Sequence, residues 1–383
     1  MRNPVLVPLS AATLVMAVAL SAPARVVGQV PVDALVNQGD DKTVEAARKA
    51  SPHSGDDAMK FFQAEVDAQM AKAVARVWDP RKPLPPSPRT PWGDPDLRGY
   101  WMSVTYTPMQ RPRDVTKPFY EPEEAVNAFR KAVAEDAAVD PATVHYDWKE
   151  FGMDAWQSPV RPNLRTALVV DPPDGRIPEM TPDARKRAQN AGRGAIVQNR
   201  GLAERCITGN QGPPRVGGHD NDSQILQVPG YVILVTQSNH DVRIIPLDGR
   251  PHLDASVKTW LGDSRGHFEG DTLVIDTTNF HPDRDWRGST TNLHLVERLT
   301  RAADDTLKYQ FTVSDPTTWT KSWSVENPWP RGDGPIYEWA CHEQNYGLIN
   351  VVKGAQIREA EYLALPPEQR ARQRAPNGGG GGE

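Results

Sequence analysis

Short apolar runs separated by turn signals constrain the fold of this chain most strongly, and they are clearest between residues 239 and 298. The runs rich in β-branched and aliphatic residues cover 242–245, 273–275 and 293–296. Asp248-Gly249 and Glu269-Gly270-Asp271 lie between them and are typical of turns that join short strands. His, Asp, Arg and Glu side chains are interspersed among the same runs. The segment therefore predicts a β scaffold that holds a polar site.

The same pattern continues through the second half of the chain. Strands are predicted at 224–227, 231–237, 242–246, 266–269, 272–278, 293–300, 306–313, 319–325 and 336–342. Asp304-Asp305 and Asp315-Pro316 are expected at hairpin turns. Short strands at this spacing predict a mainly β fold, an antiparallel meander that forms a closed or nearly closed barrel.

The first 24 residues have the features of a signal peptide. An apolar run at 6–20 follows the basic residue Arg2, and Ala22-Pro23-Ala24 fits the small-x-small cleavage pattern. The run is short for a spanning helix, although an uncleaved N-terminal anchor is the alternative. No later segment is apolar for 18 residues, so we expect no integral membrane segment after cleavage. The expected location is the periplasm or the exterior of the cell.

The remaining chain is predicted to have three parts. Residues 25–91 are expected to form a helical N-terminal extension, with apolar residues at four-residue steps in 42–78, followed by a Pro-rich linker at 79–91. Residues 92–350 are the predicted main domain, and residues 351–383 are predicted to form a C-terminal helix and a disordered Gly-rich tail. Within the main domain, helices are expected at 121–137 and 182–191, with Thr181 as an N-cap. A turn followed by a strand is expected in 92–101, and a further strand at 165–170.

Charge and cysteine content narrow the classes of partner. The formal net charge of −5 gives no reason to expect nucleic acid as a partner. The two cysteines, Cys206 and Cys341, are expected to form a disulfide in an exported protein. Two separate buried thiols are the alternative. Because CxxC spacing is absent, a zinc knuckle or thioredoxin chemistry is not expected.

Several long motifs carry a resemblance. They are RTPWGDPDLRGYW (89–101), RTALVVDPPDGRIPEMTP (165–182), HDVRIIPLDGRPH (240–252), WLGDSRGHFEGDTLVIDTTNF (260–280), NLHLVERLTR (292–301), DPTTWTKSW (315–323) and YEWACHEQNYG (337–347). Over about 89–350 the chain resembles a widespread family of uncharacterised exported bacterial proteins, which implies a recurring architecture and transfers no activity. Gly99-Tyr100-Trp101 is also similar to the G-x-W at the start of lipocalin-like barrels, which implies a barrel fold and settles no function.

The predicted strand 293–300 contains the strongest candidate for an acid or base. Because strand side chains alternate between faces, Glu297 shares a face with Leu293, Leu295 and Leu299. A carboxylate on an apolar face needs a cationic or donor partner, or it becomes protonated. Glu297 is therefore a candidate for acid/base catalysis, and a structural Glu–Arg pair is the alternative. The opposite assignment, with His294 and Arg298 inside, stays open.

The segment that follows the predicted strand 231–237 adds three further candidates. Asp241 and Arg243 share one strand face, whereas His240 lies on the opposite face. Arg243 is a candidate to bind a substrate carboxylate through two hydrogen bonds, and a surface Asp241–Arg243 ion pair is the alternative. His240 is a candidate acid or base.

Two further segments complete the candidate site. Asp263 and Arg265 belong to a tight polar loop at 262–267 and are candidates to orient a substrate, with simple turn formation as the alternative. His342 follows Cys341, which would position it as a base or ligand, although a structural histidine is the more common outcome. Ser264 is not in a G-x-S-x-G elbow, so a hydrolase nucleophile is not expected there.

No cofactor is predicted. The histidines show no H-x-H, H-E-x-x-H or H-x₃-H spacing, so no metal site is expected, and neither a Gly-rich phosphate loop nor a Rossmann fingerprint is present. Most of the eleven tryptophans are expected in the core, but some, with Trp319 as the candidate, would suit an aromatic ligand.

The sequence supports three functional hypotheses. The first is an exported β-barrel enzyme without an organic cofactor, a lyase, isomerase or hydrolase that binds an aromatic or carboxylate-bearing small molecule. In this hypothesis Glu297, His240 and His342 transfer protons, and Arg243, Asp263, Arg265, Asp241 and Trp319 bind the substrate. The second is a periplasmic binding or carrier protein without catalysis. The third is an envelope interaction protein that uses the helix predicted at 42–78.

Overall fold

The computed structural model describes residues 68, 70–137, 160–190, 196–209, 212–216, 222–343 and 345–372. All of them belong to the compact unit that begins at Ala68. The predicted signal peptide, most of the helix predicted at 42–78 and the Gly-rich tail lie outside the described residues.

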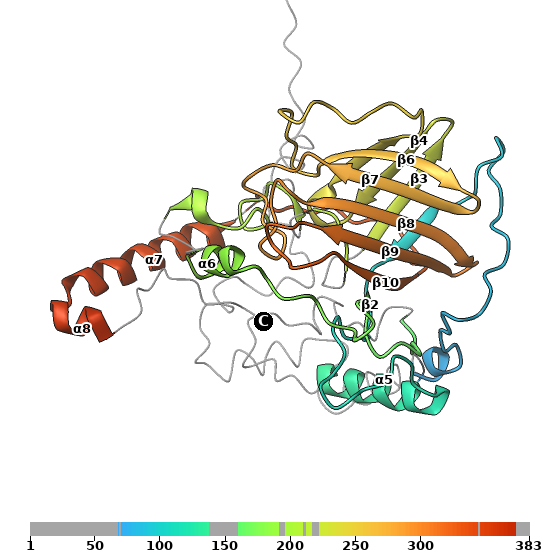
Figure 1. Cartoon of the computed structure of the whole chain (residues 1–383), viewed down its shortest axis with the longest axis horizontal. Coiled ribbons are helices and arrows are strands. Elements are labelled where there is room, and N and C mark those ends of the chain that lie inside the picture. The colour runs from blue at the N-terminus through green and yellow to red at the C-terminus, as the bar shows by residue number, and fades with distance from the viewer. Residues whose placement is uncertain are drawn as a thin grey trace, which may run out of the picture. The chain divides into compact units, whose positions relative to one another are not determined.

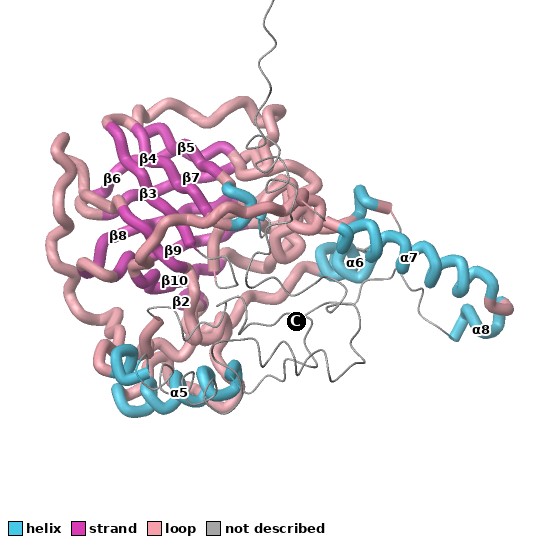
Figure 2. The backbone as a smooth tube through the Cα atoms, turned by 180° about the vertical axis from the view of Figure 1, so that it is seen from behind, coloured by secondary structure: helices cyan, strands magenta, loops and turns pink. Residues whose placement is uncertain are grey.

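Two antiparallel sheets form the centre of the described unit (Figures 1 and 2). The first sheet has the order β1-β3-β4-β5, with β1 at Gly99–Met102, β3 at Asp222–Val228, β4 at Tyr231–Thr236 and β5 at Val242–Pro246. The second has the order β2-β10-β9-β8-β7-β6, with β2 at Val169–Asp171, β6 at Asp263–Glu269, β7 at Thr272–Thr278, β8 at His294–Ala303, β9 at Thr306–Ser314 and β10 at Trp323–Pro330. The predicted mainly β, antiparallel fold is therefore confirmed.

The two sheets share one apolar core, which follows from the alternation of side chains along each strand. In β4, Val232 and Leu234 are buried whereas Tyr231 is exposed. In β8, Leu295 and Leu299 are fully buried, and they alternate with partly exposed residues. Apolar side chains from both sheets belong to the same cluster, so the interior between the sheets is filled by protein.

A closed barrel is not found among the described strands. The hydrogen-bonded ladders stop between β5 and β6, which are connected by a long loop instead of a tight hairpin. At the other edge, β1 approaches the segment after β10 through a single isolated bridge between Trp101 and Arg331. The two sheets therefore lie close at both edges without one continuous ladder.

Three predicted strands differ from the structure. The segment predicted at 336–342 is not a strand in the structure, and Pro335, which directly precedes it, lacks the N–H that a ladder requires. The predicted strand 319–325 is shifted, because Trp319 lies in the turn after Asp315 and β10 begins only at Trp323. Of the strand predicted at 165–170, only its end pairs with β10, through β2.

The helices agree better with prediction. They are α5 (Pro122–Ala137), α6 (Pro182–Asn190), α7 (Tyr346–Ala364) and α8 (Pro367–Arg372), together with the short 3-10 helices η2 (Val197–Asn199) and η4 (Ser238–His240). Thr181 caps α6 as predicted, since its hydroxyl oxygen accepts from the Ala184 N–H at 3.1 Å. None of the helices in the described part of the chain combines the length and apolar character needed to cross a membrane.

The predicted disulfide between Cys206 and Cys341 is formed, with the two Cα atoms 5.7 Å apart. It joins the segment before the first long strands to the irregular segment that precedes α7. Next to it, the side chain of Asn345 caps α7 by accepting from the Leu348 N–H and donates to the carbonyl of Glu204. The disulfide therefore anchors the start of the C-terminal helix.

Candidate functional site

A buried ion pair between Arg243 and Glu297 is the centre of the candidate site. The Arg243 guanidinium donates to the two carboxylate oxygens of Glu297 at 3.1 and 2.5 Å, and the two side chains are 7% and 2% exposed. Arg243 comes from the inner face of β5 and Glu297 from the inner face of β8, so the pair connects the two sheets. The assignment of Glu297 to the leucine face is correct, and its cationic partner is Arg243.

Three hydroxyl groups complete the coordination of this pair. The Tyr309 hydroxyl donates to Oε1 of Glu297 at 2.7 Å, and the guanidinium of Arg243 donates to Ser264 at 3.0 Å and to Thr277 at 3.2 Å. Buried charges require such partners, because a hydrogen bond left unmade in the interior costs more than it does in water. Both carboxylate oxygens of Glu297 are therefore already occupied by hydrogen-bond donors.

The electrostatics favour the charged pair. Burial alone would lower the pKa of the Arg243 guanidinium, but the charge and hydrogen bonds of Glu297 outweigh it, so the pKa is raised. Burial and the neighbouring Glu297 carboxylate both raise the pKa of the Tyr309 phenol well above its usual value, which keeps its proton in place. The fully buried Arg284 is affected by the same charged residues. Burial and the positive charge of Arg243 lower the pKa of Arg284 to about 9.

A cleft of about 360 Å³ opens beside this ion pair. It lies where the ladders stop, between β5 and the segment that leads into β6. Its lining is made of Ile207, Thr208, Asp241, Val242, Arg243, Ile244, Thr259, Trp260, Leu261, Gly262, Asp263 and Ser264. Its volume is within the range of small-molecule sites, and it combines apolar walls with a few polar groups. The structure thus brings three predicted substrate-binding residues, Asp241, Arg243 and Asp263, to one cleft.

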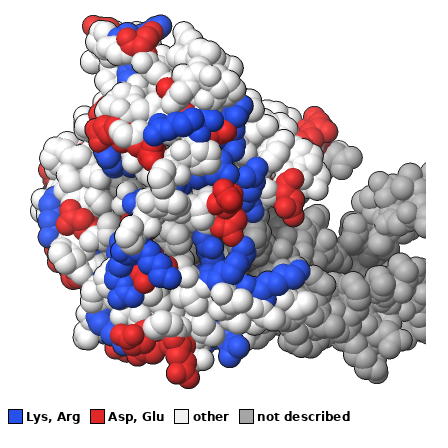
Figure 3. Space-filling model, turned by 90° about the vertical axis from the view of Figure 1, so that its right-hand side faces the viewer, with Lys and Arg blue, Asp and Glu red and all other residues white. Residues whose placement is uncertain are grey.

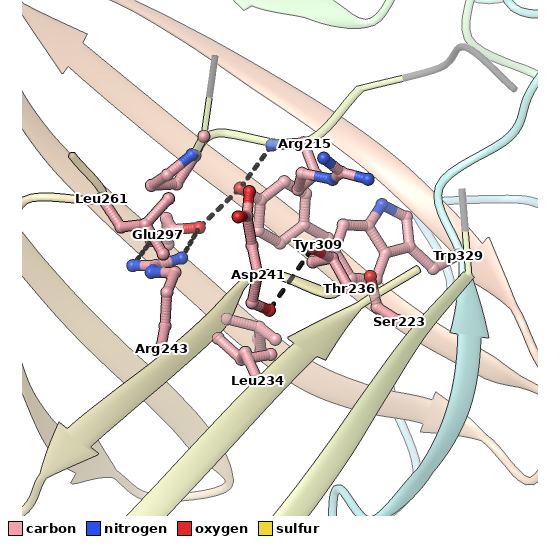
Figure 4. Close-up of a pocket in the computed structure, with 13 residues that line it drawn as sticks. Arg215, Ser223, Leu234, Thr236, Asp241, Arg243, Leu261, Glu297, Tyr309 and Trp329 are labelled. Carbon is pink, nitrogen blue, oxygen red and sulfur yellow. Dashed lines mark hydrogen bonds and ion pairs between the residues drawn. The ribbon is translucent and has the colours of Figure 1, made fainter. Parts of the chain in front are cut away.

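A second, smaller cavity lies behind the cleft, between the sheets (Figure 4). It measures about 20 Å³, which is enough for one water molecule. Asp241, Arg243 and Leu261 line both spaces, so they form the wall between them. The Ser223 hydroxyl and Nε of Arg243 are buried and have no hydrogen-bond partner in the described part of the chain, and both residues line this inner cavity. Buried polar groups of this kind are commonly satisfied by an internal water.

Asp241 is the carboxylic acid best placed to exchange a proton at the cleft. Its Oδ2 accepts from the Thr208 hydroxyl at 2.5 Å and from the Gly209 N–H at 2.9 Å. Burial raises its pKa, and this effect outweighs the two hydrogen bonds and the nearby charge of Arg215, which lower it. A carboxyl group with a raised pKa at the wall of a cleft is typical of acid/base sites.

A chain of four titratable residues extends from the cleft to the surface. Asp263 contacts Nδ1 of His252 at 2.9 Å, and Nε2 of His252 contacts Asp276 at 2.8 Å. The other oxygen of Asp276 is 2.8 Å from Nε2 of His294. Its hydrogen bond to Asp276 raises the pKa of His294, and the same hydrogen bond lowers the pKa of Asp276. Arg265 contacts the remaining oxygen of Asp263 at 2.7 Å, so it braces the start of this chain.

Sequence reasoning missed His252 and Asp276 and treated His294 only as an alternative inward residue. His252 stood in a recognised motif and Asp276 in a predicted strand, but no local spacing links them. Their contact depends on the path of the loop between β5 and β6, which brings His252 back over β6 and β7. The only sign of this contact in the sequence was that Asp276 is expected to point outward from its strand, where it can meet another side chain.

Four other predicted site residues lie away from the cleft lining. The Nε2 atom of the exposed His240 donates to the Tyr337 carbonyl at 2.8 Å, and the exposed His342 lies in the irregular segment before α7. Trp319 is 2% exposed and packs edge-on against Trp286 and Trp323 in the core. Arg265 contacts Asp263 at 2.7 Å but does not itself line the cleft. The grouping of His240, His342 and Trp319 with Glu297 at one substrate site is therefore not what the structure shows.

Neither the charges on the face shown in Figure 3 nor the His, Cys, Asp and Glu side chains of the described residues indicate a further site. On the face shown in Figure 3, basic and acidic side chains are interspersed. Within the described ranges, no group of three or more His, Cys, Asp or Glu side chains is arranged to hold a metal ion.

Comparison with known proteins does not assign the chain to a family. No protein-family model matches it, and no curated protein sequence matches it either.

Proposed function

We propose that this protein binds a small organic molecule in the cleft between β5 and β6 and acts on it by acid/base chemistry. The observation that carries the proposal is Asp241, whose carboxyl has a raised pKa and lines both the cleft and the inner cavity. A group in this position faces a ligand on one side and a space for one water molecule on the other. The reaction classes that suit this arrangement without a cofactor are hydration or dehydration, isomerisation and hydrolysis.

In this proposal Asp241 replaces Glu297 as the group that transfers the proton. Glu297 is occupied by Arg243 and Tyr309, so its role is to hold the Arg243 guanidinium at the wall of the cleft. Arg243 is then fixed in the wall between the cleft and the inner cavity, where its buried Nε–H can hold a water molecule near Asp241. The chain from Asp263 to His294 offers a path for protons between the cleft and solvent.

The proposal includes export and a barrel-like scaffold. The Cys206–Cys341 disulfide is compatible with an oxidising compartment, and we propose the periplasm or the exterior as the location, reached through the signal peptide predicted at 1–24. The approach of the two sheets at both edges supports a nearly closed, lipocalin-like barrel whose opening between β5 and β6 is the ligand entrance.

A carrier protein without catalysis is the second candidate. It is favoured by the fact that one of the cleft's carboxylates is fully engaged: Asp263 contacts His252, the Leu253 N–H and Arg265. A site with its polar groups already paired binds a ligand mainly by shape and apolar contact.

The first experiment locates the binding site. A library of small organic molecules is screened by ligand-observed NMR against the wild type, Ile207→Trp and Val296→Trp. Ile207 lines the cleft, so the Trp side chain there should exclude ligands, whereas Val296 is a matched position on the outer face of β8. Molecules that bind the wild type and Val296→Trp but not Ile207→Trp occupy the cleft. If every ligand binds Ile207→Trp equally well, the cleft is not the site.

The second experiment separates enzyme from carrier. The cleft ligands are incubated with the wild type and with Asp241→Asn, and the mixtures are analysed by mass spectrometry. The proposal expects a product from the wild type and at least a 100-fold slower reaction with Asp241→Asn at saturating ligand, because general acid/base groups contribute about 10²–10⁴-fold. Recovery of every ligand unchanged from both proteins would establish the carrier.

A further inference from the structure

The outer face of the four-stranded sheet is apolar. Five large apolar residues on it are 37–62% exposed: Leu226, Val228, Tyr231, Val242 and Ile244. Ile233 and Val235 lie between them on β4 and are partly exposed. These seven residues are called the apolar face below. An antiparallel sheet with one face in the core usually presents polar residues on the other face, so this surface is unusual.

The outer face of the six-stranded sheet provides the contrast within the same unit. Its outward positions carry polar and charged side chains, among them Asp276, Arg298, Lys308, Gln310 and Thr312. Of the two sheets in the described part of the chain, only the four-stranded sheet therefore has an apolar outer face; exposed apolar side chains also occur on α7, among them Tyr346 and Ile357.

The apolar face is continuous with the cleft. Leu226 is paired with Ile233 and Ile233 with Ile244, so three apolar side chains lie next to one another across three strands. This row is about 10 Å wide, because neighbouring strands are about 4.8 Å apart. Ile244 and Val242 also line the cleft. A molecule whose polar end lies in the cleft can therefore lay an apolar body over the face without leaving the protein.

We propose that the ligand of the cleft is an amphiphile with an uncharged, hydroxyl-bearing head and a hydrocarbon body that covers the apolar face. This inference rests on the proposed function, in which the cleft binds a small molecule, and it specifies the class of that molecule. The body is hydrocarbon because the seven residues of the face carry no charge and only the Tyr231 hydroxyl as a polar side-chain group.

The side chains that line the cleft determine which kind of polar head the ligand can have. The carboxyl groups of Asp241 and Asp263 line it, and the charge of Arg243 is already paired with Glu297. An anionic head would meet the acidic groups without a free cation, so a carboxylate-bearing ligand, expected from the sequence, fits less well. A hydroxyl group can donate to the carboxyl of Asp241. The Thr259 hydroxyl also lines the cleft, and it is buried without a partner in the described part of the chain.

The test uses alkyl β-glucosides as probes, with methyl, hexyl and octyl chains, each below its critical micelle concentration. Binding to the full exported chain is measured by isothermal titration calorimetry. The inference expects affinity to rise about fourfold for each added methylene, because burying one contributes about 0.8 kcal/mol. Equal affinity for the methyl and octyl compounds, or no binding of any, overturns the inference.

Three variants localise the hydrocarbon body. Leu226→Lys places a charge on the apolar face and should weaken octyl glucoside binding at least tenfold. Thr312→Lys, a matched exposed position on β9, should leave binding unchanged. Ile207→Trp, which fills the cleft, should abolish binding of the head. An effect of Leu226→Lys equal to that of Thr312→Lys overturns the amphiphile inference while leaving the cleft proposal standing. Normal octyl glucoside binding by Ile207→Trp contradicts the cleft proposal instead.

A second copy of the chain is the competing occupant of the apolar face. Size-exclusion chromatography with light scattering decides between the two. The inference expects the same molecular mass for the wild type and Leu226→Lys. A wild-type dimer that Leu226→Lys converts to a monomer shows that the face is covered by protein and overturns the amphiphile assignment.

Discussion

Arg243 on β5 and Glu297 on β8 join the two sheets across the interior through hydrogen bonds of 3.1 and 2.5 Å. Buried apolar residues flank the pair along each strand, Leu295 and Leu299 on β8 and Ile245 on β5. Such pairs seldom add net stability compared with apolar residues of equal size, because both charges lose their hydration. Its presence at the wall of a cleft therefore points to a positioning role.

Removal of one partner from this pair should destabilise the protein strongly. Glu297→Gln keeps the shape of the side chain but leaves the Arg243 charge buried and unpaired, so the free energy of unfolding should fall by about 3–5 kcal/mol. Urea unfolding followed by tryptophan fluorescence measures this change.

Two controls separate an unpaired charge from lost packing. Arg298→Gln removes an exposed ion pair on the opposite face of the same strand, and it should change stability little. The double variant Arg243→Met/Glu297→Leu removes both charges and should be less destabilised than Glu297→Gln. A double variant that is as unstable as the sum of the single variants would contradict this explanation.

Asp241 should make stability depend on pH in the direction opposite to that of an ordinary aspartate. Its folded pKa is raised, so the folded state binds its proton more tightly than the unfolded state. The group therefore favours folding at low pH, and this contribution is lost as pH rises from the unfolded pKa, about 3.9, through the raised folded pKa. Asp241→Asn removes this dependence.

The measurement is urea unfolding of the wild type and Asp241→Asn between pH 4 and pH 7. The stability of the Asn variant relative to the wild type should increase with pH over this range. In the Asn variant the contacts of residue 241 with Thr208 and Gly209 do not change with pH, so the slope of the difference reports the titration of the Asp241 carboxyl. A stability difference between the two proteins that does not change with pH would show that the pKa of Asp241 is the same in the folded and unfolded states.

His294 and Asp276 should titrate as a pair. The hydrogen bond between them raises the pKa of His294, so the charged pair stabilises the fold below the unfolded histidine pKa of about 6.5. That contribution is lost as pH rises through the folded pKa of His294. Asp276→Asn should move the pKa of His294 down toward its unfolded value.

Two-dimensional ¹H–¹⁵N NMR of the imidazole nitrogens follows His294 directly across pH 5–9. His267→Gln serves as the control, because His267 is an exposed histidine of β6 that contacts Glu269 and has no contact with Asp276. The titration of His294 should be the same in that variant as in the wild type. An unchanged His294 titration in Asp276→Asn would rule out the proposed link.

The sequence predicted the parts of this fold that depend on local pattern. Alternation along 293–300 placed Glu297 among leucines, and the capping residue Thr181 placed the start of α6. It could not supply contacts that depend on the path of a long loop, such as that of His252 with Asp263 and Asp276. It also misjudged the segment at 336–342, where apolar and polar residues alternate as in a strand but no neighbouring strand pairs with it. The alternation of side chains along a strand shows that a residue faces inward. It does not show which partner from another strand that residue contacts.

The Cys206–Cys341 disulfide should contribute most of its effect through the unfolded state. It links residues 135 apart in the chain, and closing a loop of this length corresponds to a term on the order of 4–5 kcal/mol in the chain-entropy description. The double variant Cys206→Ser/Cys341→Ser should therefore melt at a clearly lower temperature than the wild type. In this variant the first turn of α7 should also exchange its amide hydrogens faster, because Asn345 caps that helix next to the disulfide.

Calorimetry with and without reductant measures the melting temperature. Reductant should lower the melting temperature of the wild type but not that of the double variant. Two free thiols in denatured wild-type protein purified without reductant would show that the bond does not form, and any effect of the serines would then be one of packing.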